Sequence, residues 1–127
     1  MRLLLDTHVM LWWLRDTPKL GPRARAAIAE ATVQPLVSIA SFWELSIKAR
    51  KFGKGELGTE LVKDAAASGL EILGIHVGHL AALESLERID GHGDPFDHLI
   101  MAQAISEGAL LMTSDRDLKR YSVPIFR

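Results

Sequence analysis

The sequence predicts an α/β sandwich, in which helices pack against a mainly parallel sheet. Short apolar runs alternate along the chain with longer segments whose apolar residues recur every three or four positions. Glycine and proline residues separate these segments, as they often do between strands and helices. Such alternation is typical of strand–helix–strand units and of a parallel sheet. The length of 127 residues fits a single domain over residues 1–127.

The first half of the chain is predicted to form strands and helices in alternation. In order, these are a strand at residues 2–5, helices at 9–14 and 22–31, a strand at 35–38 and a helix at 39–51. Each strand is a short, mostly apolar run, which is typical of a strand buried on both faces. Pro22 suits the first turn of the second helix, and Gly53 and Gly55 end the third helix.

The second half continues the same pattern. The predicted elements are a helix at residues 58–68, a strand at 70–73, helices at 76–86 and 95–107, a strand at 109–112, a short helical or turn segment at 114–121 and an edge strand at 123–126. Asp94 followed by Pro95 is typical of an N-cap and a first helical position. Gly108 is typical of a helix C-terminus.

The composition excludes several kinds of protein. A hydrophobic fraction of 48%, a charged fraction of 24% and a net charge of −1 are ordinary for a globular chain, so charge alone does not indicate nucleic-acid binding. The absence of cysteine excludes disulfides and thiolate zinc sites. No apolar stretch approaches the roughly 18 residues of a membrane span, and Asp6 and His8 interrupt the apolar N-terminus. We therefore expect a cytoplasmic protein without membrane contact.

Four acidic residues are predicted to lie at one edge of the sheet. Asp6 and Asp115 come directly after strands, whereas Glu44 and Asp97 lie in the early turns of helices. In right-handed strand–helix–strand units, the carboxyl ends of strands and the amino ends of the following helices share an edge. Clustered carboxylates repel one another unless they bind a cation, and their oxygens suit Mg²⁺ or Mn²⁺. The pattern thus predicts a metal centre suited to phosphodiester hydrolysis.

Helix capping is the alternative explanation for each acid taken singly, because the helix dipole favours acidic residues near helix starts. The candidate caps are Asp6, Asp94, Ser41 with Glu44 as a capping box, and Ser114 or Asp115. Capping gives no reason for four acids to gather at one edge, so the metal centre is the preferred interpretation.

Two further groups of residues have competing interpretations. The densest basic segment comprises Lys48, Arg50, Lys51 and Lys54, and it predicts either a contact with an RNA backbone or a solvated helix face. Lys48 also has the spacing of an ordinary helix pair with Glu44. A mixed nitrogen and oxygen site for zinc or iron would use His92, Asp94, Asp97 and His98. The mixed site is less favoured because oxygen-rich sites select harder metals.

Four segments together resemble the PIN-domain ribonucleases, and among them the VapC-like toxins of toxin–antitoxin pairs. The segments are LLLDTHVMLW, SIASFWELSIK, DPFDHLIMAQA and LLMTSDRDL. The resemblance assigns the catalytic and metal-binding acids to Asp6, Glu44, Asp97 and Asp115, with Asp94 as an additional acid of one branch. Thr7 matches the hydroxyl residue beside the first acid, and Thr7, Lys48 and His98 are the candidate substrate-binding residues. His98 stands where similar sequences often have arginine, so a phosphate contact there would need a protonated histidine.

The resemblance implies a PIN-like three-layer α/β/α sandwich and an Mg²⁺- or Mn²⁺-dependent endoribonuclease. It also implies an RNA substrate, a small antitoxin that holds the enzyme inactive, and often a homodimer. Residues 58–68 and 10–14 are candidate contact surfaces for the partner. An aspartyl-phosphate phosphatase is disfavoured, because His8 stands where that chemistry needs a second aspartate. The remaining alternative is a non-catalytic interaction module whose acidic edge binds a basic protein.

Overall fold

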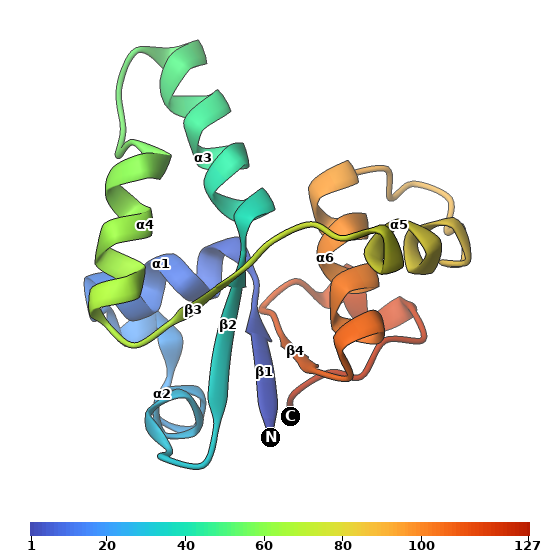
Figure 1. The fold of residues 1–127 in the computed structure, drawn as a ribbon, viewed down its shortest axis with the longest axis horizontal. Helices are drawn as coiled ribbons and strands as arrows, with labels where there is room; N and C mark the ends of the chain where they lie inside the picture. Colours follow the sequence, from blue (N-terminus) through green and yellow to red (C-terminus); the bar gives the residue numbers. More distant parts are fainter.

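The fold is a four-stranded parallel sheet with helices on both faces (Figure 1). A computed structural model describes residues 1–127. The strands are β1 (Arg2–Leu5), β2 (Gln34–Ser38), β3 (Glu71–Leu73) and β4 (Leu110–Met112), and their order in the sheet is β3–β2–β1–β4. Each neighbouring pair is parallel, so the predicted parallel sheet is confirmed.

Six α-helices and one short 3₁₀ segment connect these strands, and a second 3₁₀ segment follows the last strand. The helices are α1 (Thr7–Arg15), α2 (Pro22–Ala29), α3 (Ile39–Phe52), α4 (Gly58–Ala67), α5 (Val77–Glu84) and α6 (Pro95–Glu107), and the 3₁₀ segments are η1 (Pro18–Leu20) and η2 (Arg116–Arg120). Every predicted helix is present, with ends that differ by a few residues. Left-handed glycines end α3 and α6, as Gly53 and Gly108 predict.

Successive side chains of β1 point to opposite faces of the sheet, and each face has its own hydrophobic core. Leu3 and Leu5 point into one core, which also contains residues of α1, α2 and α4, whereas Leu4 points into the other, which contains residues of α6. All three leucines are fully buried. Figure 1 shows α1, α2 and α4 on one side of the sheet and α5 and α6 on the other. This arrangement confirms the expected three-layer α/β/α sandwich.

Two local predictions are wrong. The edge strand expected at residues 123–126 is reduced to one bridge between Leu111 and Ile125. Pro124 has no N–H to donate, so the ladder cannot extend through it. The capping box that was the alternative explanation for Ser41 and Glu44 is absent, because α3 begins earlier, where the Ser38 hydroxyl accepts a hydrogen bond from the Ala40 N–H at 3.0 Å.

None of the helices combines the length and the apolar character that crossing a bilayer would need.

Candidate metal centre

Asp6 occupies the junction between β1 and α1 and is almost fully buried. Its N–H donates to the Met112 carbonyl at the end of β4, at 3.0 Å. One carboxylate oxygen, Oδ1, accepts a hydrogen bond from the Val9 N–H at 2.8 Å and so caps α1. The other, Oδ2, accepts from the Thr113 hydroxyl. Burial raises the pKa of Asp6 above its usual range, although both hydrogen bonds oppose the shift. An ionised Asp6 is therefore costly in the absence of a cation.

Thr113 links the first acid to the last. While its hydroxyl donates to Asp6, its Oγ1 accepts a hydrogen bond from the Asp115 N–H at 3.0 Å. The Asp115 carboxylate in turn caps η2 by accepting from the Asp117 N–H at 2.9 Å. Asp117 is paired with Arg120 and lies outside the cluster. The loop after β4 is thus shaped to hold Asp115 near Asp6.

Asp97 lies in the first turn of α6 and faces the same edge. Asp94 caps this helix by accepting hydrogen bonds from the Phe96 and Asp97 N–H groups at 2.8 and 3.2 Å. The pKa of Asp97 is raised to about 6, mainly by burial and next by the charge of Asp94, with a smaller contribution from Asp115. Asp97, Asp115 and His92 bring one potential ligand atom each to within 4.8 Å of one another. This trio is the tightest part of the centre.

Glu44 lies in the second turn of α3. Its side chain is mostly buried and forms an ion pair with Lys48, one helical turn later, at 3.4 Å. The first turn of α3 is tied to α1 by the Thr7 hydroxyl, which donates to Ser41 Oγ at 2.9 Å. Trp43 packs edge-on against Phe96, which joins α3 to the start of α6. Glu44 does not belong to the 4.8 Å group, although the contacts of Ser41 and Trp43 hold its helix beside the starts of α1 and α6.

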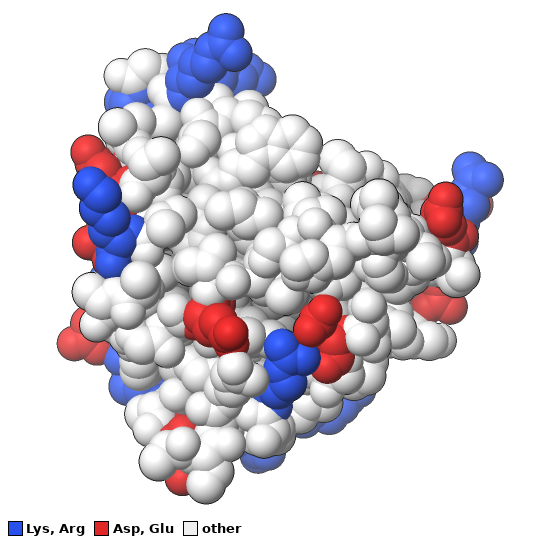
Figure 2. Space-filling model, viewed as in Figure 1, with Lys and Arg blue, Asp and Glu red and all other residues white.

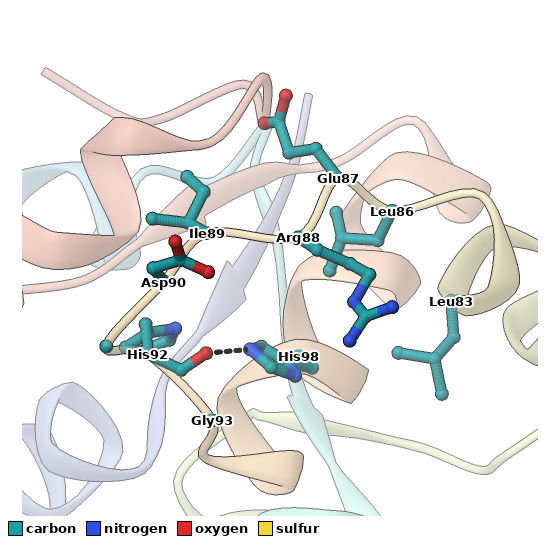
Figure 3. A pocket seen from close by; sticks show the side chains of 10 residues that line it. Leu83, Leu86, Glu87, Arg88, Ile89, Asp90, His92, Gly93 and His98 are labelled. Atoms are coloured by element: carbon teal, nitrogen blue, oxygen red, sulfur yellow. Dashed lines mark hydrogen bonds between the residues drawn. The ribbon is translucent and has the colours of Figure 1, made fainter.

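Two of the predicted substrate-contacting residues use their polar atoms internally. The Thr7 side chain is buried, and its hydroxyl bonds to Ser41. His98 Nε2 donates to the His92 carbonyl at 3.0 Å (Figure 3). The same nitrogen also lies 3.3 Å from the Tyr121 hydroxyl. The ring of His98 borders a cavity of about 430 Å³, which is lined by none of the carboxylates described above.

The donor set fits a divalent cation. Asp6, Asp97 and Asp115 offer carboxylate oxygens, which hard cations prefer. Burial is the main cause of the raised pKa values of Asp6 and Asp97, and the charge of Asp115 adds a smaller contribution to both. The buried His92 Nε2 has no hydrogen-bond partner and faces the same point. His98, which the zinc or iron alternative required, is turned toward the loop carbonyl instead.

The basic residues Lys48, Arg50, Lys51 and Lys54 are all exposed, on or just beyond the second half of α3. Figure 2 shows lysine and arginine side chains gathered at the end of the molecule where α3 ends, next to a face with little charge. Seven residues of helix separate Glu44 from Lys51, or about 10 Å along the axis. Lys48 is paired with Glu44, whereas the rest of the basic group lies further along α3 and just beyond it.

Comparison with known proteins agrees with this geometry. Residues 3–124 match the PIN domain. The chain belongs to the PIN-domain family. It is 32% identical to ribonuclease VapC22 of Mycobacterium tuberculosis over 123 residues, which cover 95% of this chain and 92% of the relative. In this PIN domain, the four acids Asp6, Glu44, Asp97 and Asp115 lie at the strand ends and helix starts that the sequence predicts to share one edge of the sheet.

Solved structures share the fold of this PIN domain at low sequence identity. VapBC2 from Rickettsia felis, bound to a promoter DNA fragment, has a TM-score of 0.73 and 18% identity, with coverage of 100% of this chain and 98% of the other. The sarcin-ricin loop cleaving toxin VapC20 of Mycobacterium tuberculosis has a TM-score of 0.67 and 14% identity, with 98% of each chain covered.

Sequence reasoning missed two residues that organise the centre. Thr113 stands in the segment LLMTSDRDL but has no sequence signal of its own, because its role depends on the side-chain neighbours of β1. Tyr121 follows η2 and places its hydroxyl 2.9 Å from His92 Nδ1. The sequence predicts a role for His92 only in the zinc or iron alternative. A histidine two residues before the Asp-Pro helix start was the available signal.

Proposed function

We propose that this protein is a metal-dependent endoribonuclease that hydrolyses RNA phosphodiester bonds. The observation that carries the proposal is the meeting of Asp6, Asp97 and Asp115, from three separate segments, at one edge of the sheet. Membership of the PIN-domain family and the relation to a ribonuclease over nearly the whole chain support the same reaction.

The acids have distinct roles in this proposal. Asp97 and Asp115 would bind Mg²⁺ or Mn²⁺ directly, with Asp6 and Glu44 completing the negative environment. Asp94 adds its charge and orients the first turn of α6 through its two N-cap hydrogen bonds. When bound, the cation supplies charge stabilisation for the displacement at phosphorus. Buried carboxylates with raised pKa values gain most from that cation, because it offsets their desolvation.

The substrate would meet the basic group at the end of α3. Lys48, Arg50, Lys51 and Lys54 can neutralise phosphates on either side of the scissile bond, and such contacts carry no sequence information by themselves. Thr7 supports this surface by bonding to Ser41 and thereby holding α1 against α3. His98 would reach a phosphate only after leaving the His92 carbonyl.

We further propose that the protein is the toxin of a toxin–antitoxin pair. Its fold matches that of toxins in VapBC complexes. Exposed apolar residues at Ile39, Trp43 and Ile47 recur every fourth position along α3 and form a surface suited to a protein partner, either the antitoxin or a second copy in a homodimer.

The test is cleavage of a mixed tRNA and ribosomal RNA pool by the purified protein with Mg²⁺, with Mn²⁺ and with EDTA. We expect metal-dependent cleavage that falls at least about a hundredfold in Asp97→Asn, because the variant keeps the side-chain shape but loses a metal-binding charge. Asp64→Asn on α4 is the matched control, since its exposed side chain lies on another element. Equal cleavage by wild type and Asp97→Asn, or cleavage that persists in EDTA, would refute the proposal.

A further inference from the structure

We propose that His92 Nε2 is a direct ligand of the divalent cation, so that the centre combines imidazole nitrogen with carboxylate oxygen and binds Mn²⁺ in preference to Mg²⁺. The inference rests on the proposed metal-dependent function and adds a ligand to it. Three independent features of His92 carry it: its burial, the separation of its nitrogen from the neighbouring oxygens, and the way both ends of the residue are held.

The first feature is a buried nitrogen without a partner. The His92 side chain is only 8% exposed, and its Nε2 makes no hydrogen bond. Such atoms are rare in folded proteins, because an unsatisfied buried polar group costs free energy. The Nε2 atom faces the Asp97 carboxylate, and His92 offers one ring nitrogen within 4.8 Å of carboxylate oxygens of both Asp97 and Asp115. A cation between these groups would provide the missing partner.

The second feature is distance. His92 Nε2 lies 3.4 Å from Asp97 Oδ2, which is longer than an ordinary N–H···O hydrogen bond. Two ligands that each lie about 2.1 Å from one cation are separated by roughly 3.0 to 3.4 Å when the angle between them is about 90 to 110°. The pair already has the spacing of two ligands of one ion. The Asp115 carboxylate, within 4.8 Å of both atoms, supplies a third direction.

The third feature is the orientation of the ring. His92 Nδ1 lies 2.9 Å from the Tyr121 hydroxyl, and the two rings meet edge to face. When Nδ1–H donates to this hydroxyl oxygen, the lone pair of Nε2 is free for a cation, which is the usual arrangement of a histidine ligand. The backbone of His92 is also held, because its carbonyl accepts the His98 hydrogen bond drawn in Figure 3.

A nitrogen ligand changes the relative affinity of the centre for Mn²⁺ and Mg²⁺. Mg²⁺ strongly prefers oxygen ligands in a regular octahedron, whereas first-row transition ions accept imidazole more readily. Loss of His92 should therefore weaken Mn²⁺ binding more than Mg²⁺ binding. The competing arrangement has a proton on Nε2 that is donated to Asp97, in which case His92 would only orient that carboxylate.

Pulsed EPR of Mn²⁺ bound to the purified protein distinguishes these arrangements without RNA, because it detects ¹⁴N directly bonded to the ion. We expect nitrogen coupling in the wild type and its loss in His92→Phe and His92→Gln. The first variant keeps an aromatic ring beside Tyr121, and the second keeps a polar side chain should the first not fold. The dissociation constant for Mn²⁺ should rise about 10- to 100-fold. His8→Gln, which alters an exposed histidine near Asp6, should keep the coupling.

Mn²⁺ bound without nitrogen coupling, or coupling that persists in both His92 variants, would overturn the assignment. The metal-dependent nuclease would survive that result, since the carboxylates would still hold the ion. Failure of the wild type to bind Mn²⁺ or Mg²⁺ in a titration would instead overturn both the ligand assignment and the proposed function.

Discussion

At the scale of single residues, capping and metal binding are compatible roles. Asp6 caps α1 with one carboxylate oxygen while the other faces Thr113. Asp115 likewise caps η2 and also offers a potential ligand atom to the trio with His92 and Asp97. A carboxylate has two oxygens and several lone pairs, so a helix start can fix its orientation without using its whole binding capacity. Capping therefore pre-organises these acids.

The first prediction concerns Asp6→Asn without metal. Burial raises the pKa of Asp6, so the neutral amide should be better tolerated than the carboxylate at pH 7.5. We expect the melting temperature in EDTA to rise by a few degrees, since about 1 kcal/mol corresponds to roughly 3 to 6 °C in a chain of this length. The change in melting temperature is measured by thermal denaturation that is monitored by circular dichroism.

The same experiment with saturating Mg²⁺ should remove this advantage, because the cation stabilises the ionised carboxylate of the wild type. Asp64→Asn, an exposed site on α4, should leave the melting temperature almost unchanged in both conditions. A lower melting temperature for Asp6→Asn in EDTA would show that its hydrogen bonds outweigh the cost of burying its charge.

At the scale of elements, close contacts hold the helices that carry the site. Gly58 is the first residue of α4 and lies against α3, so a Cβ atom there would overlap the Ser46 hydroxyl and the Phe42 carbonyl oxygen. On the other side of the sheet, the buried His79 of α5 donates from Nε2 to Glu107 at the end of α6. His79 Nδ1 accepts from the His76 N–H, which determines this tautomer. The pKa of Glu107 is lowered by His79 and by Arg2 of β1.

The second prediction is that Gly58→Ala destabilises the protein by about 1 to 3 kcal/mol, because the new methyl group must push backbone away. Gly78→Ala on α5 is the matched control. Its Cβ would meet only Ser106 Oγ, at an ordinary 3.5 Å, and alanine favours a helix by about 0.5 kcal/mol. Urea denaturation should therefore separate the two variants in opposite directions; a neutral Gly58→Ala would mean that α3 and α4 part easily.

At the scale of the whole molecule, the fold concentrates like charge at one edge of the sheet. Asp97 has a folded-state pKa of about 6, against an ordinary value of 3.8. The native state thus binds this proton more tightly than the unfolded chain does. Its stabilising contribution is present below about pH 4 and is lost as the pH rises through about 6.

The third prediction follows from this loss of stability as the pH rises. In EDTA, the free energy of unfolding of the wild type relative to Asp97→Asn should fall between about pH 4 and 6, by at most about 3 kcal/mol. Comparing the two proteins cancels the opposite contribution of Glu107, whose lowered pKa favours the native state at higher pH. With saturating Mg²⁺ the relative stability of the wild type should instead rise with pH. If the difference in free energy of unfolding between the two proteins does not change with pH in EDTA, the raised pKa of Asp97 is contradicted.

The sequence alone determined the order of the elements, the parallel sheet and the edge at which the acids stand. These features depend on local patterns, because apolar periodicity identifies each element and the handedness of strand–helix–strand units sets their edge. Capping signals were also reliable where they depend on adjacent residues, as with Asp94 before Pro95. The Ser41 and Glu44 pattern failed because Ser38 lies earlier and caps α3 first.

Only the tertiary structure decided which side chains meet. Thr113 and Asp6 are 107 positions apart, and their hydrogen bond exists because β1 and β4 are neighbours in the sheet. The packing of Tyr121 and His98 around the loop before α6 likewise turns His92 toward the acids and His98 toward a carbonyl. Side-chain direction depends on contacts between distant segments, and no local pattern in the sequence encodes such contacts.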